Sequence, residues 1–136
     1  MNDTELKKIM KKTLGQLLYQ KKYIAPVDLL MALGYLSERD HENWRMGRVD
    51  FMEQVCSTNL KRLSRIMKLL RIYAKEHNLS PSLTAYMTWG DQKKRKLKFS
   101  KTGKYFIEQA YATHYISIYK PPKKLKEITE DTVEVK

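Results

Sequence analysis

The chain has 136 residues, which is enough for one compact domain with a hydrophobic core and short for two. Its 42% hydrophobic and 31% charged residues exclude a disordered chain, and no apolar run approaches the roughly 18 residues of a membrane span. The single cysteine, Cys56, excludes an intramolecular disulfide and, with no signal-peptide core, favours a cytoplasmic location, while the net charge of +12 indicates an anionic partner.

The sequence of the first half predicts helices. Pro26 suits a first helical position, and Gly34 suits the position after a last turn. Ser37 is expected to cap the next helix, and Asp50 one further turn near residues 51–55. Over residues 3–20, apolar side chains recur at three- and four-residue steps with lysines between them, and this period predicts the first helix. The predicted helices span residues 3–20, 26–33 and 38–46.

The longest periodic segment predicts a helix over residues 59–77, with Asn78 in the left-handed position that ends it. Its apolar residues cover one broad side. The other side carries the cations Lys61, Arg65, Lys68, Arg71 and Lys75. Exposed helix faces are commonly basic, but Glu76 and Glu53 are the only nearby carboxylates, so this side is a second basic surface.

After residues 80–82 the hydrophobic period changes to two, which predicts a β-hairpin with strands near 83–89 and 96–101. The alternation is expected to place Trp89 and Phe99 in the core and to leave Tyr86 exposed.

The end of the predicted domain contains a short helix over residues 104–112, followed by "HYISIY", which offers a third strand. Two prolines, Pro121 and Pro122, then end the ordered body. We therefore expect an α+β fold: a single compact domain over residues 1–120, in which the hairpin packs against the helix at 59–76, and a flexible C-terminal tail over 121–136.

The predicted hairpin carries the strongest charge signal of the chain. Residues 91–126 contribute +9 to the net charge, whereas residues 127–136 contribute −3. Lysines on a sheet edge can simply prevent aggregation, but two or three would be enough for that purpose. Seven cations within twelve residues repel one another unless an anion relieves them, which favours a polyanion-binding role. They are Lys93, Lys94, Arg95, Lys96, Lys98, Lys101 and Lys104, with Asp91 as the only carboxylate among them.

A basic helix followed by a basic hairpin is also the winged-helix way of holding DNA, which requires both elements on one exposed side. A standard helix-turn-helix does not fit, because alignment on Gly34 puts Leu30 where a small residue is expected and Asp40 at an apolar position. RNA is the second choice, since the alternation removes most aromatic rings from the surface.

We therefore expect a nucleic-acid-binding protein without enzymatic activity that contacts phosphates, of double-stranded DNA in preference to RNA. The alternative is an adaptor that docks an acidic protein partner on the same basic face, with Trp44 and the surface tyrosines as anchors. The expected nucleic-acid contacts are Lys61, Arg65, Lys68, Arg71, Lys75, Lys93, Lys94, Arg95, Lys96, Lys98 and Lys101.

Catalysis has little support in the sequence, and we expect no cofactor and no metal site. In "DHENW", Asp40, His41 and Glu42 point in different directions on a helix, and no second histidine follows four residues later. Cys56 follows an apolar turn and is expected to be buried and unreactive. The carboxylates of residues 127–136 are expected to compete with nucleic acid for the basic face.

Overall fold

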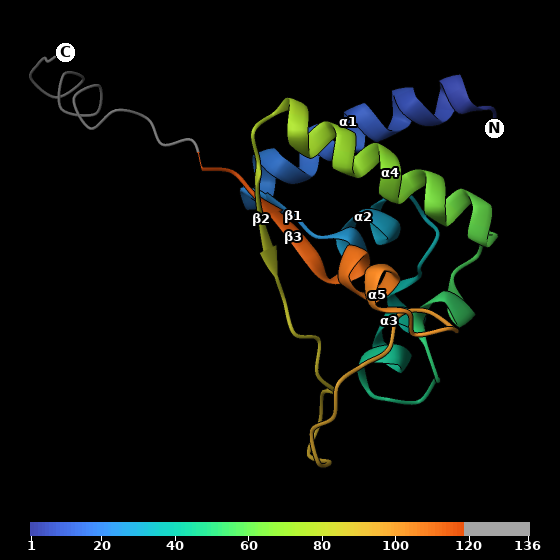
Figure 1. Ribbon diagram of the computed structural model, residues 1–136. Helices are drawn as coiled ribbons and strands as arrows, with labels where there is room; N and C mark the ends of the chain where they lie inside the picture. Colours follow the sequence, from blue (N-terminus) through green and yellow to red (C-terminus); the bar gives the residue numbers. More distant parts are fainter. Residues whose placement is uncertain (119–136) are drawn as a thin grey trace, which may run out of the picture.

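A helical N-terminal half is followed by short strands and one further helix, so the fold is α+β as predicted (Figure 1). The structure is a computed structural model that describes residues 1–118. The predicted tail, residues 121–136, lies outside the described residues. The elements are α1 (Asp3–Lys21), β1 (Tyr23–Ile24), α2 (Pro26–Ala32), α3 (Glu38–Arg45), the 3-10 turn η1 (Met52–Val55), α4 (Leu60–Glu76), β2 (Ser80–Leu83), α5 (Tyr105–Ala112) and β3 (Thr113–Ile116).

Polar caps begin the helices where the sequence supplies them. The Asn2 side chain accepts a hydrogen bond from the Glu5 backbone N–H (2.8 Å), and the Glu5 carboxylate accepts one from the Asn2 N–H (3.0 Å). Ser37 caps α3 as predicted, and Asn59 caps α4, where its side-chain oxygen accepts a hydrogen bond from the Arg62 backbone N–H at 2.8 Å. Asn78, with φ of 54°, takes the left-handed position predicted for it.

The three strands form one antiparallel sheet in the order β1-β3-β2. β3 lies in the middle, where Ile116 pairs with Tyr23 on one side and with Ser80 on the other. The third strand was therefore correctly predicted in kind, but its neighbours were not. β1 has only two residues, too few to produce a periodic signal, and β2 ends at Leu83, where the predicted hairpin was expected to begin.

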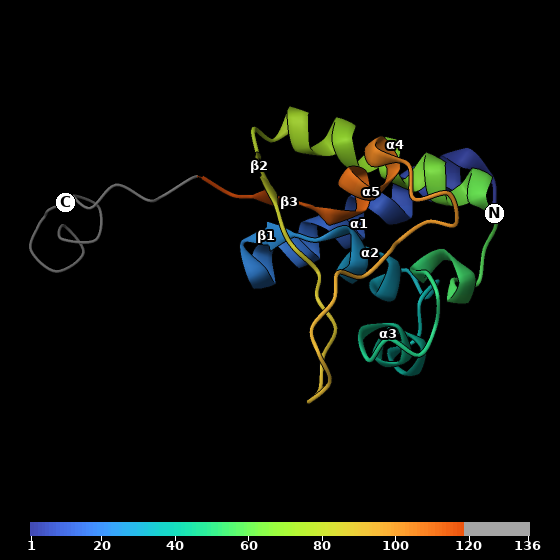
Figure 2. The ribbon, with the colours of Figure 1, turned by 60° about the horizontal axis from the view of Figure 1, so that its bottom comes forward.

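The predicted hairpin is an irregular arm rather than a pair of regular strands, and we call residues 84–100 the basic arm. Its two sides are joined by one isolated pair, Met87 with Lys96. Backbone hydrogen bonds next to this pair run from the Thr88 N–H to Arg95 O (3.0 Å) and from the Leu97 N–H to Tyr86 O (2.8 Å). The basic arm projects from the body of the molecule (Figures 1 and 2).

The predicted side-chain alternation is correct for the returning side of the basic arm and wrong for its outgoing side. Leu97 and Phe99 are buried, but Tyr86 is only 7% exposed and Trp89 is 41% exposed. The physical reason is competition for the core, since both alternating sets contain apolar residues. Tyr86 packs against the buried ring of Trp44, whereas Trp89 packs on the outside.

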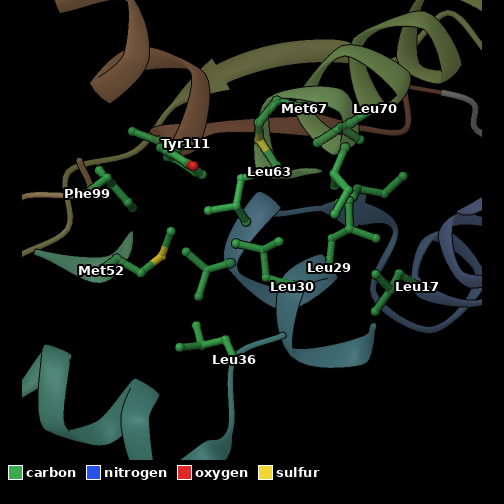
Figure 3. Packing of buried hydrophobic residues seen from close by; sticks show 14 of the residues in the cluster. Leu17, Leu29, Leu30, Leu36, Met52, Leu63, Met67, Leu70, Phe99 and Tyr111 are labelled. Carbon is green, nitrogen blue, oxygen red and sulfur yellow. The ribbon is translucent and has the colours of Figure 1, made fainter. Parts of the chain in front are cut away.

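The core is one cluster of buried side chains in which α4 packs on α1 and α2. Figure 3 shows Leu63, Met67 and Leu70 of α4 directed toward Leu29 and Leu30 of α2. All of these leucines are 1% exposed or less. A Leu-to-Ala change at such a site costs about 2–5 kcal/mol, so this packing fixes the position of α4. No helix among residues 1–118 is long and apolar enough to cross a membrane.

Candidate nucleic-acid interface

The basic arm is held to the body by the C-terminal end of α3. Trp44 is completely buried, and its indole N–H donates a hydrogen bond to the Lys98 backbone carbonyl at 2.9 Å. Its ring packs against Phe99 with 5.1 Å between centroids. Trp44 therefore packs inside, as expected, and this burial contradicts its alternative role as an anchor for a partner protein.

Arg45 joins the outgoing side of the basic arm to α3. Its guanidinium carbon lies 4.6 Å from the centre of the Trp89 ring and 4.9 Å from that of Tyr86. The Trp89 backbone N–H donates to Arg45 O at 2.7 Å, and the guanidinium donates to Met87 O at 3.4 Å. Partial burial lowers the pKa of Arg45. This side chain positions the arm, a role that the sequence did not reveal.

Three of the five cations in the basic arm donate hydrogen bonds to backbone carbonyls, either within the arm or in segments next to it. The Lys94 ammonium donates to Thr88 O at 3.0 Å and to Gly90 O at 3.2 Å. Arg95 donates to Gly47 O at 2.9 Å, and Lys98 donates to Lys101 O at 2.8 Å. These three side chains remain exposed, so their charges still act on the surroundings.

Lys93 and Lys96 are also exposed. Within residues 1–118, neither ammonium has a hydrogen bond or an ion pair in the structure. Asp91 is the only carboxylate of the basic arm. Lys93 and Lys96 are therefore the two arm cations available for an anionic ligand with no bond to break.

Glu108 of α5 holds the returning side of the basic arm. Its carboxylate accepts hydrogen bonds from the Phe99 N–H (2.9 Å), the Ser100 N–H (2.8 Å) and the Ser100 hydroxyl (2.6 Å). Nearby, the Tyr111 hydroxyl donates to the Glu53 carboxylate at 2.8 Å, and burial together with this carboxylate raises the pKa of Tyr111. The sequence did not indicate either acid, because their partners lie on other elements.

The predicted cations of α4 do not all face the same way. Lys61, Arg65 and Lys68 line a groove between α4 and α1, whereas Arg71 lines a different groove between α4 and α5. Lys75 is exposed near the end of the helix. The amphipathic pattern placed these residues outside the core correctly but could not show which neighbours flank the helix.

Arg65 is the α4 cation that an acidic side chain already neutralises. Its guanidinium makes two hydrogen bonds of 2.8 Å to the Asp3 carboxylate, and the Lys7 ammonium lies 3.6 Å from the same group. The Arg65 guanidinium lowers the pKa of Asp3. Arg65 is thus a weaker candidate for phosphate binding than Lys61 or Lys68.

α1 adds lysines to this region that the sequence did not assign to the site. Lys7 and Lys11, four residues apart, line a second groove between α1 and α4 together with Arg65. Their spacing was visible in the sequence, but the packing of α1 beside α4 was not. We call Lys7, Lys11, Lys61, Arg65 and Lys68 the α1–α4 surface.

The basic arm and the α1–α4 surface lie on opposite sides of the molecule. In both Figure 1 and Figure 2 the tip of the arm points away from α4, so the two do not form the single exposed side that we expected. The reason is that α4 is followed by β2, which carries the chain away from the helix before the arm begins. Lys101 also departs from the expected grouping, since it lines the α4–α5 groove with Arg71.

Two of the residues considered for catalysis, His41 and Cys56, pack against aromatic or other hydrophobic side chains. No set of three or more His, Cys, Asp or Glu side chains that could hold a metal ion occurs within residues 1–118. The centroids of the His41 and Trp89 rings lie 5.5 Å apart. The pKa of His41 is lowered mainly by burial and to a smaller extent by the positive charge of Arg45. Burial raises the pKa of the Cys56 thiol to about 12, so the thiol stays protonated at neutral pH.

Comparisons with known proteins do not place this chain in a family. No family model, curated protein or solved structure significantly matches the chain.

Proposed function

We propose that the protein binds nucleic acid, double-stranded DNA in preference to RNA, through contacts between the basic arm and the phosphate backbone. One observation carries this proposal: a projecting element bears five cations, Lys93, Lys94, Arg95, Lys96 and Lys98, against one carboxylate. Such a local field concentrates polyanions, and phosphate contacts give affinity without sequence preference.

The packing of the aromatic residues favours a duplex over a single strand. Single-strand binders stack unpaired bases on exposed rings. In the basic arm, Tyr86 and Phe99 are 7% and 2% exposed, and one face of Trp89 is taken by Arg45. The arm therefore offers cations for a backbone but no row of free rings for bases.

The α1–α4 surface is the second place where phosphates can bind in this proposal. Lys61 and Lys68 are exposed there, and Lys75 follows on the same helix. Because this surface lies away from the tip of the arm, we treat it as a separate contact and not as part of one continuous site.

The proposal is tested by fluorescence anisotropy with labelled duplex DNA, duplex RNA and single-stranded DNA across a salt series. Replacement of Lys93 and Lys96 by glutamine removes two free arm cations without breaking a hydrogen bond of the arm. We expect the affinity for duplex DNA to fall about tenfold or more at ~0.1 M salt, and the slope of log K against log salt to become about two units shallower.

A matched variant removes the same charge elsewhere. Lys61→Gln with Lys68→Gln should weaken binding to a short duplex much less than the arm variant does, because α4 lies away from the tip of the arm. Equal losses in the two variants would reject the arm as the principal contact. If the unmodified protein binds none of the three nucleic acids in dilute buffer, the proposed function is rejected.

A further inference from the structure

An apolar groove between α4 and α5 has no role in the proposed function. α5 lies beside the middle of α4 in both overall views (Figures 1 and 2), and the groove between them has a volume of about 350 Å³. Met67 and the ring of Tyr111, both almost fully buried, form part of its lining. Leu60 of α4 and Phe106 of α5 stand at its edges.

These edge side chains are exposed to an extent that the fold does not require. Phe106 is 84% exposed and Leu60 is 63% exposed, and Ile107, which also lines the groove, is 37% exposed. Large apolar side chains gathered on one surface mark contact sites for other molecules, whereas single exposed apolar residues do not. Leu60, Phe106 and Ile107 all line one groove. Tyr105, which precedes Phe106 in the chain, is 69% exposed as well.

The charges at the groove define the partner further. Arg71 of α4 and Lys101 both line it. The only carboxylate in the lining, Glu53, is already engaged, since it accepts from the Tyr111 hydroxyl at 2.8 Å and from the Lys101 N–H at 3.4 Å. The groove therefore combines an apolar lining with two cations against one carboxylate, which leaves it with a net positive charge.

We propose that this groove binds an acidic amphipathic helix of a partner protein. The apolar face of such a helix would cover Met67, Phe106 and Leu60, while its carboxylates would face Arg71 and Lys101. A helix suits this site because the walls are side chains at helical spacing, Leu60, Ser64, Met67 and Arg71 on α4, with no strand edge among them. Nucleic acid does not suit it, since phosphates gain nothing from exposed apolar rings.

The test uses a labelled synthetic helix with leucine at positions i, i+3, i+4 and i+7 and glutamate elsewhere. Fluorescence anisotropy with the full chain compares it with a scrambled peptide of the same composition and with a version carrying lysine for glutamate. We expect the acidic amphipathic peptide to bind at least tenfold more tightly than both. Equal binding of the scrambled peptide would overturn the proposal, because it would assign the affinity to net charge alone.

Two variants locate the binding in the groove. Phe106→Ala should weaken peptide binding about tenfold, and Arg71→Glu should shift the preference toward the lysine peptide. Tyr19→Ala is the matched control, because Tyr19 is 80% exposed on α1, away from the groove, and it should leave peptide affinity unchanged. Both groove side chains are exposed, and thermal unfolding of each variant confirms that the fold is retained.

The remaining outcomes separate this proposal from the nucleic-acid function. Phe106→Ala should bind duplex DNA as well as the unmodified chain does. Loss of DNA binding in that variant, with peptide binding retained, would assign the groove to nucleic acid and overturn the proposal. Self-association that Phe106→Ala abolishes would assign the groove to a second copy of the chain and would overturn it too.

Discussion

Glu108 determines where the returning side of the basic arm lies. Its carboxylate joins α5 to the backbone at Phe99 and Ser100 through three hydrogen bonds, the shortest of 2.6 Å. Charge-assisted bonds of this kind are about twice as strong as neutral ones. Glu108, a residue of the body, thus orients the returning side of the basic arm, which carries the free cation Lys96.

We expect Glu108→Gln to destabilise the protein by about 1–3 kcal/mol, because the amide cannot accept three hydrogen bonds and turns a donor toward donors. Urea unfolding followed by circular dichroism measures this difference. Glu76→Gln is the control, since Glu76 is an exposed carboxylate on α4, and its effect should stay within about 0.5 kcal/mol. Equal stability of the Glu108 variant and the unmodified chain would show that these hydrogen bonds contribute little to the free energy of unfolding.

At the scale of elements, the helices and the strand β3 could be predicted from the sequence, whereas the pairing of the strands could not. Periodicity and caps such as Ser37 and Asn59 are local signals, and they located α3 and α4. Strand pairing is not local: β3 pairs with a two-residue strand more than ninety positions earlier, between Ile116 and Tyr23. Only tertiary packing selects such a partner.

The candidate site, too, could be predicted only where its signal is local in the sequence. The cations of the basic arm are visible in the sequence as a run, so the arm was predicted as a charged element. What the sequence could not show is that Lys94, Arg95 and Lys98 bind backbone carbonyls, or that the arm points away from α4. The Arg95 contact is to Gly47, 48 positions earlier in the chain, whereas the Lys94 and Lys98 contacts and the direction of the arm depend on the path of the backbone.

The attachment of the basic arm to α3 predicts a second measurable effect. Arg45→Lys keeps the positive charge but loses the planar group that lies 4.6 Å from the Trp89 ring. We expect a loss of about 1–2 kcal/mol in stability and faster trypsin cleavage after Lys93 to Lys96, because the arm detaches more often. Proteolysis followed by mass spectrometry measures the cleavage rate.

Arg39→Lys is the matched control for this experiment, because Arg39 is an exposed arginine on the same helix. It should leave both stability and cleavage unchanged. A cleavage rate that rises equally in the two variants would mean that Arg45 does not hold the arm.

At the scale of the whole molecule, the positive charge is divided between regions that point in different directions. The tip of the basic arm lies at one end and the α1–α4 surface at the other, while the α4–α5 groove, with Arg71 and Lys101, borders α4 and the base of the arm. A separated distribution of this kind allows two ligands to bind at once. It also means that the tip of the arm and the α1–α4 surface should respond to salt and to substitution independently of each other.

The acidic residues 127–136, with a net charge of −3, should act on this distribution as an internal competitor for polyanions. We expect deletion of these residues to tighten duplex DNA binding by about three- to tenfold at ~20 mM salt and by less than twofold at ~200 mM, because salt screens the charges. A full-length variant with amides at Glu127, Glu130, Asp131 and Glu134 separates charge from length and should behave like the deletion. Anisotropy titrations at the two salt concentrations measure both. Unchanged affinity in dilute buffer, or tightening by the deletion but not by the amide variant, would show that these carboxylates do not compete for the basic surfaces.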